Sequence, residues 1–154
     1  MDFLRRNVLL AVVFVTGACV LILEVVAVRL LSPFFGNTIF TVSSVLSVIL
    51  AALSLGYYIG GRVADRHPLT RWFFSIILVS GLGVLFMQTV ALLLLPAFSS
   101  FFSLVYGPLI SALSFFFIPS FLLGMLSPYV IALQHARMRD VGIGSISGKV
   151  FFWS

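Results

Sequence analysis

Glu24 is the residue whose type and setting point most directly to chemistry, because it is a carboxylate inside the apolar run of residues 7–31. A charged side chain at the centre of a membrane helix costs about 3 kcal/mol on insertion scales, so such residues mark ion, proton or ligand sites. Counting about 1.5 Å per residue places Glu24 roughly 10 Å below one membrane boundary. Ser47 and Gln88, in the next two apolar runs, fall at a similar depth. We predict a cation or proton site in which Glu24 supplies the charge and Ser47 and Gln88 act as neutral ligands.

Glu24 also has a second interpretation, as a buried structural acid. It would then bond to hydroxyls at similar depth, such as Ser44 or Ser114, or pair with Arg29. Arg29 lies about 140° around a straight helix from Glu24, so a direct pair is not expected along the helix itself. Arg29 then snorkels to the headgroups, or meets Glu24 where the helix ends. Both interpretations of Glu24 stay open at this point.

The elements that must position these residues are membrane helices. Of the 154 residues, 62% are hydrophobic and 8% are charged, with a mean hydropathy of +1.25. Soluble domains are about one quarter charged, so this composition excludes a soluble globular protein. The length leaves no room for a soluble catalytic domain. We therefore expect no catalytic residue, no metal site and no cofactor in this chain.

Four apolar runs reach the ~20 residues needed to cross a bilayer, and a fifth run is shorter. The four runs cover residues 7–31, 39–59, 72–95 and 109–133, and the start of a further helix covers about 149–154. Pro96 is expected to end the third run, and residues 98–106 are expected to form an interfacial or re-entrant segment. The predicted fold is an all-α integral membrane protein in one domain. Because the last run is so short, we also expect a fragment or a split subunit.

The basic residues predict the orientation in the membrane. The connections after the first and third runs carry no charge, and eight of the nine basic residues lie toward the opposite side: Arg5, Arg6, Arg62, Arg66, Arg71, Arg137, Arg139 and Lys149. The positive-inside rule then places both termini in the cytoplasm. We expect a multi-pass protein of a bacterial or archaeal cytoplasmic membrane. Membrane topology accounts for the net charge of +5, so we expect no nucleic-acid partner.

Small and polar residues follow one side of the second run within an arc of about 80°. They are Ser43, Ser47, Ala51, Ser54, Tyr58 and Gly61. Such a stripe favours close helix packing, and Gly56 and Gly60 add a GxxxG contact. The alternative is a pathway for a solute.

The fourth run contains two interior prolines, Pro119 and Pro128, with Ser120, Gly124 and Ser127 on one face. Interior prolines remove backbone hydrogen bonds, which a neighbour or a cavity must replace. Broken helices surround many transporter sites, although single prolines also shape ordinary membrane bundles. The sequence is compatible with both.

Several motifs together resemble those of a known family. They are residues 24–26, 29–32, 35–38, 55–66, 121–128 and 147–150. The chain resembles, over nearly its whole length, the membrane domain of spermidine-synthase-like proteins. In that family several transmembrane helices, often described as major-facilitator-like, precede a soluble aminopropyltransferase-like domain. The resemblance implies a major-facilitator-like bundle and a link to polyamine metabolism.

Residues 60–66 look like the loop between the second and third helices of major-facilitator transporters. Physically they fit a tight cytoplasmic turn, in which Gly60 and Gly61 allow close backbone approach. Asp65 would cap or pair, while Arg62 and Arg66 would anchor at lipid phosphates. We expect these five residues to have a structural or topological role.

These observations lead to two function hypotheses. The first is a transporter-like membrane module that handles a polyamine or another cationic solute. The second is a non-transporting anchor or accessory subunit of a larger membrane complex. No α/β pattern typical of the family's soluble domain follows the membrane runs, so we do not expect aminopropyl transfer in this chain. The expected partners are the lipid bilayer, further membrane chains or a missing soluble domain, and a cationic small molecule.

Overall fold

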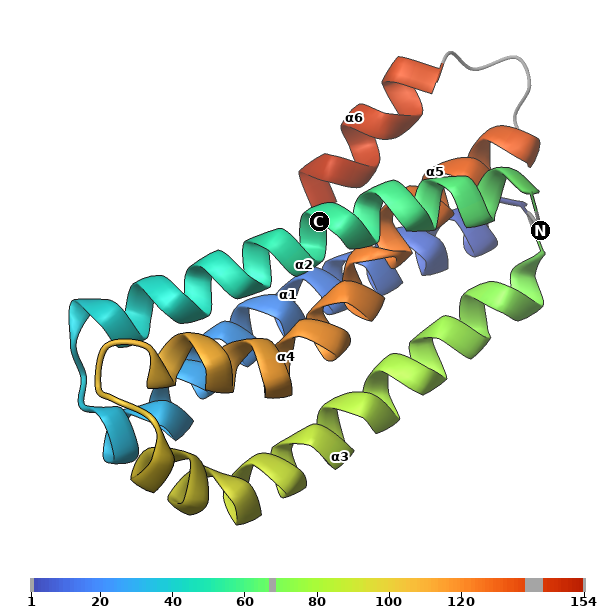
Figure 1. The fold of residues 1–154 in the computed structure, drawn as a ribbon. Coiled ribbons are helices and arrows are strands. Elements are labelled where there is room, and N and C mark those ends of the chain that lie inside the picture. Colours follow the sequence, from blue (N-terminus) through green and yellow to red (C-terminus); the bar gives the residue numbers. More distant parts are fainter. Residues whose placement is uncertain (1, 67–68, 138–142, 154) are drawn as a thin grey trace.

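The computed structural model describes residues 2–66, 69–137 and 143–153, which form helices joined by short connections (Figure 1). In chain order the helices are α1 (Asp2–Phe35), α2 (Ile39–Arg66), α3 (Thr70–Phe101), α4 (Gly107–Gly124), α5 (Leu126–Arg137) and α6 (Ile143–Trp153). No strand occurs in these ranges, which confirms the all-α prediction. Four segments are long and apolar enough to cross a membrane: Val8–Phe35, Ile39–Arg66, Thr70–Phe101 and Gly107–His135.

Two connections differ from the prediction because helices continue through them. Residues 60–66 were expected to turn, but α2 stays helical to Arg66, and Gly60 and Ala64 are buried in the bundle. Pro96 was expected to end the third helix, but α3 continues to Phe101. A proline in a membrane helix forfeits one backbone hydrogen bond without ending the helix. The expected interfacial segment therefore reduces to a turn at residues 102–106.

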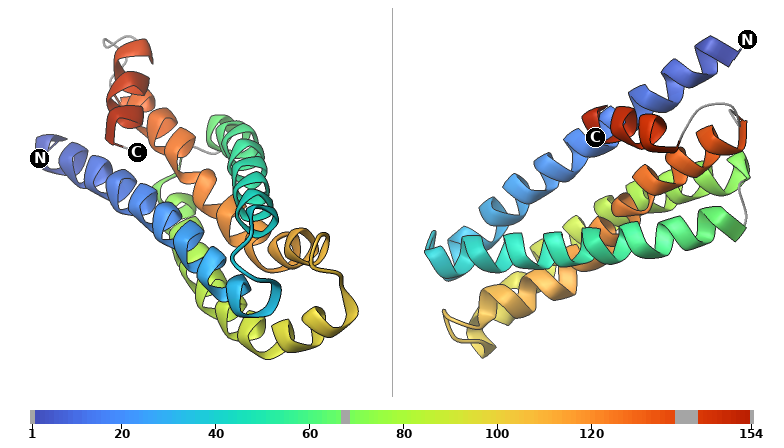
Figure 2. Two further views of the ribbon diagram at one scale, coloured as in Figure 1. Left: turned by 90° about the vertical axis from the view of Figure 1, so that its left-hand side faces the viewer. Right: turned by 90° about the horizontal axis from the view of Figure 1, so that it is seen from above.

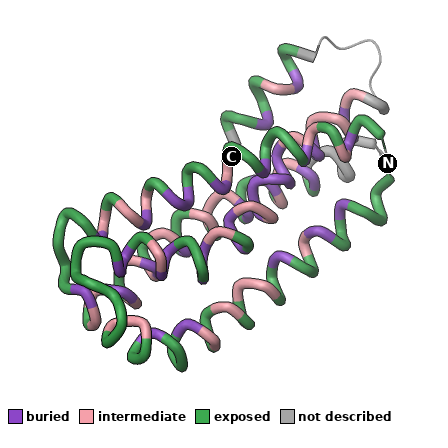
Figure 3. The backbone as a smooth tube through the Cα atoms, in the orientation of Figure 1, coloured by how far each residue is buried: buried purple, intermediate pink, exposed green. Residues whose placement is uncertain are grey.

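The span made of α4 and α5 lies at the centre of the bundle. In the span Gly107–His135, 56% of an 18-residue apolar window is buried, against 17–33% of the corresponding windows in the three other spans. Buried positions accordingly concentrate along α4 and α5 (Figure 3). Small buried residues of α4, including Ser111, Ala112, Ser120 and Gly124, allow neighbouring helices to approach closely.

Most of the basic residues belong to segments at one end of the bundle. The N-terminus of α1, the end of α2, the start of α3 and the end of α5 lie together, while residues 36–38 and 102–106 lie at the opposite end (Figures 1 and 2). Arg62, Arg66 and Arg71 occupy the first of these ends and are exposed. Lys149 is exposed on α6, whereas Arg139 lies outside the described residues. This arrangement fits the predicted separation of charged and uncharged connections.

The GxxxG contact of α2 is confirmed. A Cβ atom on Gly56 would overlap the carbonyl oxygen of Phe121 and lie 3.1 Å from the Cα of Gly124. A Cβ atom on Gly60 would lie 2.6 Å from the Cα of Met125 and 2.7 Å from its carbonyl oxygen. The backbone of α2 therefore rests directly on the junction of α4 and α5.

The predicted packing role of the small polar stripe on α2 is wrong within this chain. Ser43, Ser47, Ala51, Ser54 and Tyr58 are exposed. The buried face of α2 consists instead of Thr41, Val45, Val48, Ile49, Ala52, Gly56, Gly60 and Ala64. Ser43 satisfies its own hydroxyl by donating to the carbonyl of Ile39 at 2.6 Å, so it needs no neighbouring helix.

Two hydrophobic clusters divide the interior along its length. The basic-end cluster includes Leu9, Val13, Ala64, Phe73, Leu123, Leu126 and Tyr129. The far-end cluster includes Leu23, Leu31, Phe35, Val45, Ile49, Leu95 and Phe115. Val20 and Val84 pack against both clusters and join them near the middle of the bundle.

At the far end, the start of α4 depends on a contact between Gly107 and Phe35. A Cβ atom on Gly107 would overlap the ring of Phe35, which is only 1% exposed. We expect Gly107→Ala to reduce the free energy of unfolding by about 1–3 kcal/mol, the usual cost of overpacking. Because the obstacle is a side chain, Phe35→Leu should recover part of this loss. A double-mutant cycle in detergent micelles measures the effect, and strictly additive losses would contradict the contact.

Candidate functional site

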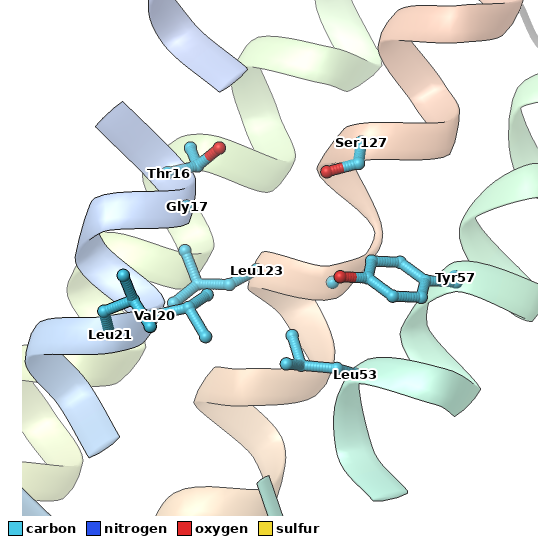
Figure 4. Close-up of a pocket in the computed structure, with 9 residues that line it drawn as sticks. Thr16, Gly17, Val20, Leu21, Leu53, Tyr57, Leu123 and Ser127 are labelled. Atoms are coloured by element: carbon cyan, nitrogen blue, oxygen red, sulfur yellow. The ribbon is translucent and has the colours of Figure 1, made fainter. Parts of the chain in front are cut away.

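A pocket of about 140 Å³ lies beside Val20, between the basic-end and far-end clusters. It is bounded by α1, α2 and the junction of α4 and α5 (Figure 4). Its lining consists of Thr16, Gly17, Val20, Leu21, Leu53, Tyr57, Leu123, Gly124 and Ser127. Most of these residues are apolar, so the three hydroxyl-bearing side chains define the pocket's polar chemistry.

The junction of α4 and α5 gives the pocket a polar backbone edge. Regular α-helix geometry would have residue 128 donate its N–H to the carbonyl of Gly124, but Pro128 has no N–H. The backbone stays α-helical through Met125, with φ of −65° and ψ of −21°, and the Met125 N–H is shared between the carbonyls of Phe121 and Leu122, each at 3.2 Å. Gly124 has no side chain, so it lines the pocket with its backbone.

Three hydroxyl-bearing side chains from three elements line the pocket. Thr16 comes from α1, Tyr57 from α2 and Ser127 from α5 (Figure 4). The hydroxyl of Thr16 donates to the carbonyl of Val13 at 2.9 Å, so its remaining capacity is to accept. Because the Thr16 hydroxyl proton is already used in this bond, the Thr16 oxygen favours a ligand that donates hydrogen bonds.

Glu24 lies one helical turn beyond the pocket on the same face of α1. It follows Val20 by four residues and Leu21 by three, and residues at these spacings share a helix face. Long side chains in a helix lean toward the preceding turn, which here is the turn that lines the pocket. The Glu24 residue is half-buried in the bundle.

The structure does not bring the other two predicted ligands to this place. Ser47 and Gln88 have exposed side chains, and neither lines the pocket. Arg29 is also exposed. The depth count along each helix was therefore insufficient, because it did not fix which side of the helix each residue occupies.

The residues predicted to have topological roles lie at the basic end. Gly60 packs on Met125, and Gly61 lies near Pro128 with room to spare. The guanidinium of Arg62 lies 4.2 Å from the centre of the Tyr58 ring, a cation–π geometry. Asp65 and Arg66 are exposed in the last turn of α2.

Sequence reasoning recognised part of the pocket wall and missed the rest. It placed Gly124, Ser127 and Pro128 in one helix that was either broken or only shaped by its prolines, and the α-helical backbone at Met125 favours the second alternative. It did not assign Thr16 or Tyr57 to a site. The available signal was the spacing of Thr16 and Gly17 from Glu24, which places all three near one face of α1.

Comparison with known proteins finds similarity to two polyamine aminopropyltransferases. It is 33% identical over 135 residues to polyamine aminopropyltransferase 2 of Ralstonia nicotianae, and equally so to polyamine aminopropyltransferase 1 of that organism. These alignments cover 86% of this chain but only 25% and 24% of the two relatives. The chain thus spans about a quarter of the length of the curated relatives that it matches. No family model and no solved structure matches it.

Proposed function

We propose that this chain is a transporter-like membrane module of a polyamine aminopropyltransferase-like protein, with a major-facilitator-like bundle and the basic end in the cytoplasm. Its solute is a polyamine or a related aliphatic amine. The observation that carries the proposal is the position of Glu24 beside the pocket between the two clusters. The similarity to two polyamine aminopropyltransferases supports the choice of solute.

The electrostatics of the location favour a cation. An ammonium ion loses its hydration when it enters an apolar bundle, and a nearby carboxylate offsets that loss because charges attract strongly at low dielectric. Neutral oxygens also serve as cation ligands in many transporters. Glu24 would provide the carboxylate, and Thr16, Tyr57 and Ser127 would provide neutral oxygens on adjoining helices.

Flux measurements with the intact protein test this function. In proteoliposomes we expect uptake of radiolabelled butane-1,4-diamine to exceed that of protein-free vesicles by at least about tenfold. Butane-1,4-diol, which has the same chain length and no charge, should show no such excess, because the diol carries no charge for the Glu24 carboxylate to attract. Diamine uptake equal to that of empty vesicles would refute transport.

A membrane anchor or accessory subunit is the second candidate. It is favoured by the outward-facing stripe of Ser43, Ser47, Ala51 and Ser54, since small residues are enriched where membrane helices pack together. An anchor predicts no diamine flux and a stable complex of fixed stoichiometry. The flux experiment therefore separates the two candidates.

A further inference from the structure

We propose that the pocket at the α4–α5 junction binds one primary ammonium group of the solute, with Thr16, Tyr57, Ser127 and the Gly124 carbonyl as hydrogen-bond acceptors and Glu24 as counter-charge. This inference rests on the proposed function and deepens it. It names the chemical group that is recognised and the atoms that recognise it.

The polar atoms of the pocket match the donors of an ammonium ion. A primary ammonium has three N–H donors and no acceptor. The Thr16 hydroxyl has already donated to Val13, so it offers only lone pairs. The Gly124 carbonyl lacks the N–H that a residue other than proline at position 128 would give it. Neither oxygen has a proton left to donate, so a ligand that donates hydrogen bonds is their complementary partner.

The size of the pocket matches a short aliphatic amine. A cavity of about 150 Å³ accommodates benzene, which has six non-hydrogen atoms. The pocket's volume of about 140 Å³ thus suffices for one end of butane-1,4-diamine, namely one ammonium group and the methylene groups next to it. The methylene groups would contact the apolar side chains of Leu21, Leu53 and Leu123.

Glu24 adds the charge that the pocket itself lacks. The pocket lining contains no ionisable carboxylate, so an ammonium bound there would be uncompensated without a nearby anion. Glu24 lies one turn along α1 from Val20 and Leu21, on the same helix face. Neutral acceptors thus fix the position of the ammonium, and the carboxylate offsets its desolvation.

Two substitutions test the assignment, together with matched controls. Tyr57→Phe removes one acceptor and keeps the ring, and Pro128→Ala returns an N–H donor to the Gly124 carbonyl. We expect each to weaken binding of butane-1,4-diamine by about tenfold, as for a hydrogen bond to a charged group. Tyr58→Phe on the exposed face of α2 and Pro96→Ala in α3 are the controls, and we expect both to bind like the wild type.

Isothermal titration calorimetry of the intact protein in lipid nanodiscs measures the affinities, with helicity checked by circular dichroism. Weaker binding in both pocket variants and not in the controls would support the assignment. If Glu24→Gln weakens binding while Tyr57→Phe and Pro128→Ala do not, the pocket assignment is overturned and the proposed function stands. If the wild type does not bind the diamine, both are overturned.

Discussion

Glu24→Gln should reduce diamine flux by about 100-fold while the helical bundle remains folded. Removing one partner of a desolvated charge pair costs roughly 2–5 kcal/mol, because the other charge is left uncompensated. Glutamine keeps the size and the hydrogen-bonding capacity of the side chain, so only the charge is lost. Initial uptake rates in proteoliposomes measure the effect.

Two variants control the Glu24 experiment. Glu24→Asp keeps the charge on a shorter side chain and should retain part of the flux. Asp65→Asn removes an exposed carboxylate at the end of α2, which does not line the pocket, and should leave flux unchanged. A Glu24→Gln protein with normal flux but lower thermal stability would show that Glu24 is a structural acid.

Gly60→Ala should be strongly destabilising, as should Gly56→Ala, whose added Cβ would overlap the backbone carbonyl oxygen of Phe121. The Cβ added at Gly60 would meet the backbone of Met125 at 2.6–2.7 Å, a separation that real Cβ atoms do not adopt. Backbone cannot rotate away as a side chain can, so α2 and α5 must separate. We expect a loss of about 3 kcal/mol or more in the free energy of unfolding, at the upper end of overpacking effects.

The neighbouring glycine provides a control of opposite sign. A Cβ on Gly61 would meet only the Cβ of Pro128 at 3.9 Å, which is ordinary contact. Alanine is favoured over glycine in helices by about 1 kcal/mol, so Gly61→Ala should be neutral or slightly stabilising. Titration with dodecyl sulfate in mixed micelles compares the two, and equal stabilities would contradict the packing of α2 on the α4–α5 junction.

Much of the fold follows from the sequence because apolar length is a strong signal. The runs at residues 7–31 and 39–59 identify α1 and α2, and the uncharged connections identify the end at which they join. The pair Gly56 and Gly60 also carries its own signal, because a GxxxG spacing is enriched where helix backbones touch. These features depend on residues that are close together in the chain.

The orientation of each helix was harder to predict. Lipid is as apolar as a leucine core, so hydrophobicity does not distinguish the inward face of a membrane helix from the outward face. The serines of α2 therefore suggested an interior stripe, whereas Val45 and Ile49 are the residues that are buried. The pocket could not be predicted from the sequence for a related reason. It depends on where α1, α2 and the α4–α5 junction cross, which no local pattern encodes.

The close packing of α2 on the α4–α5 junction also has a mechanical consequence. A Cβ on Gly56 or Gly60 would collide with backbone atoms of Phe121, Gly124 or Met125, so no side chain separates these helices. Closely packed backbones cannot slide past one another without a clash. α2, α4 and α5 therefore behave as one rigid unit. Any change in the width of the pocket then falls to its remaining wall, α1.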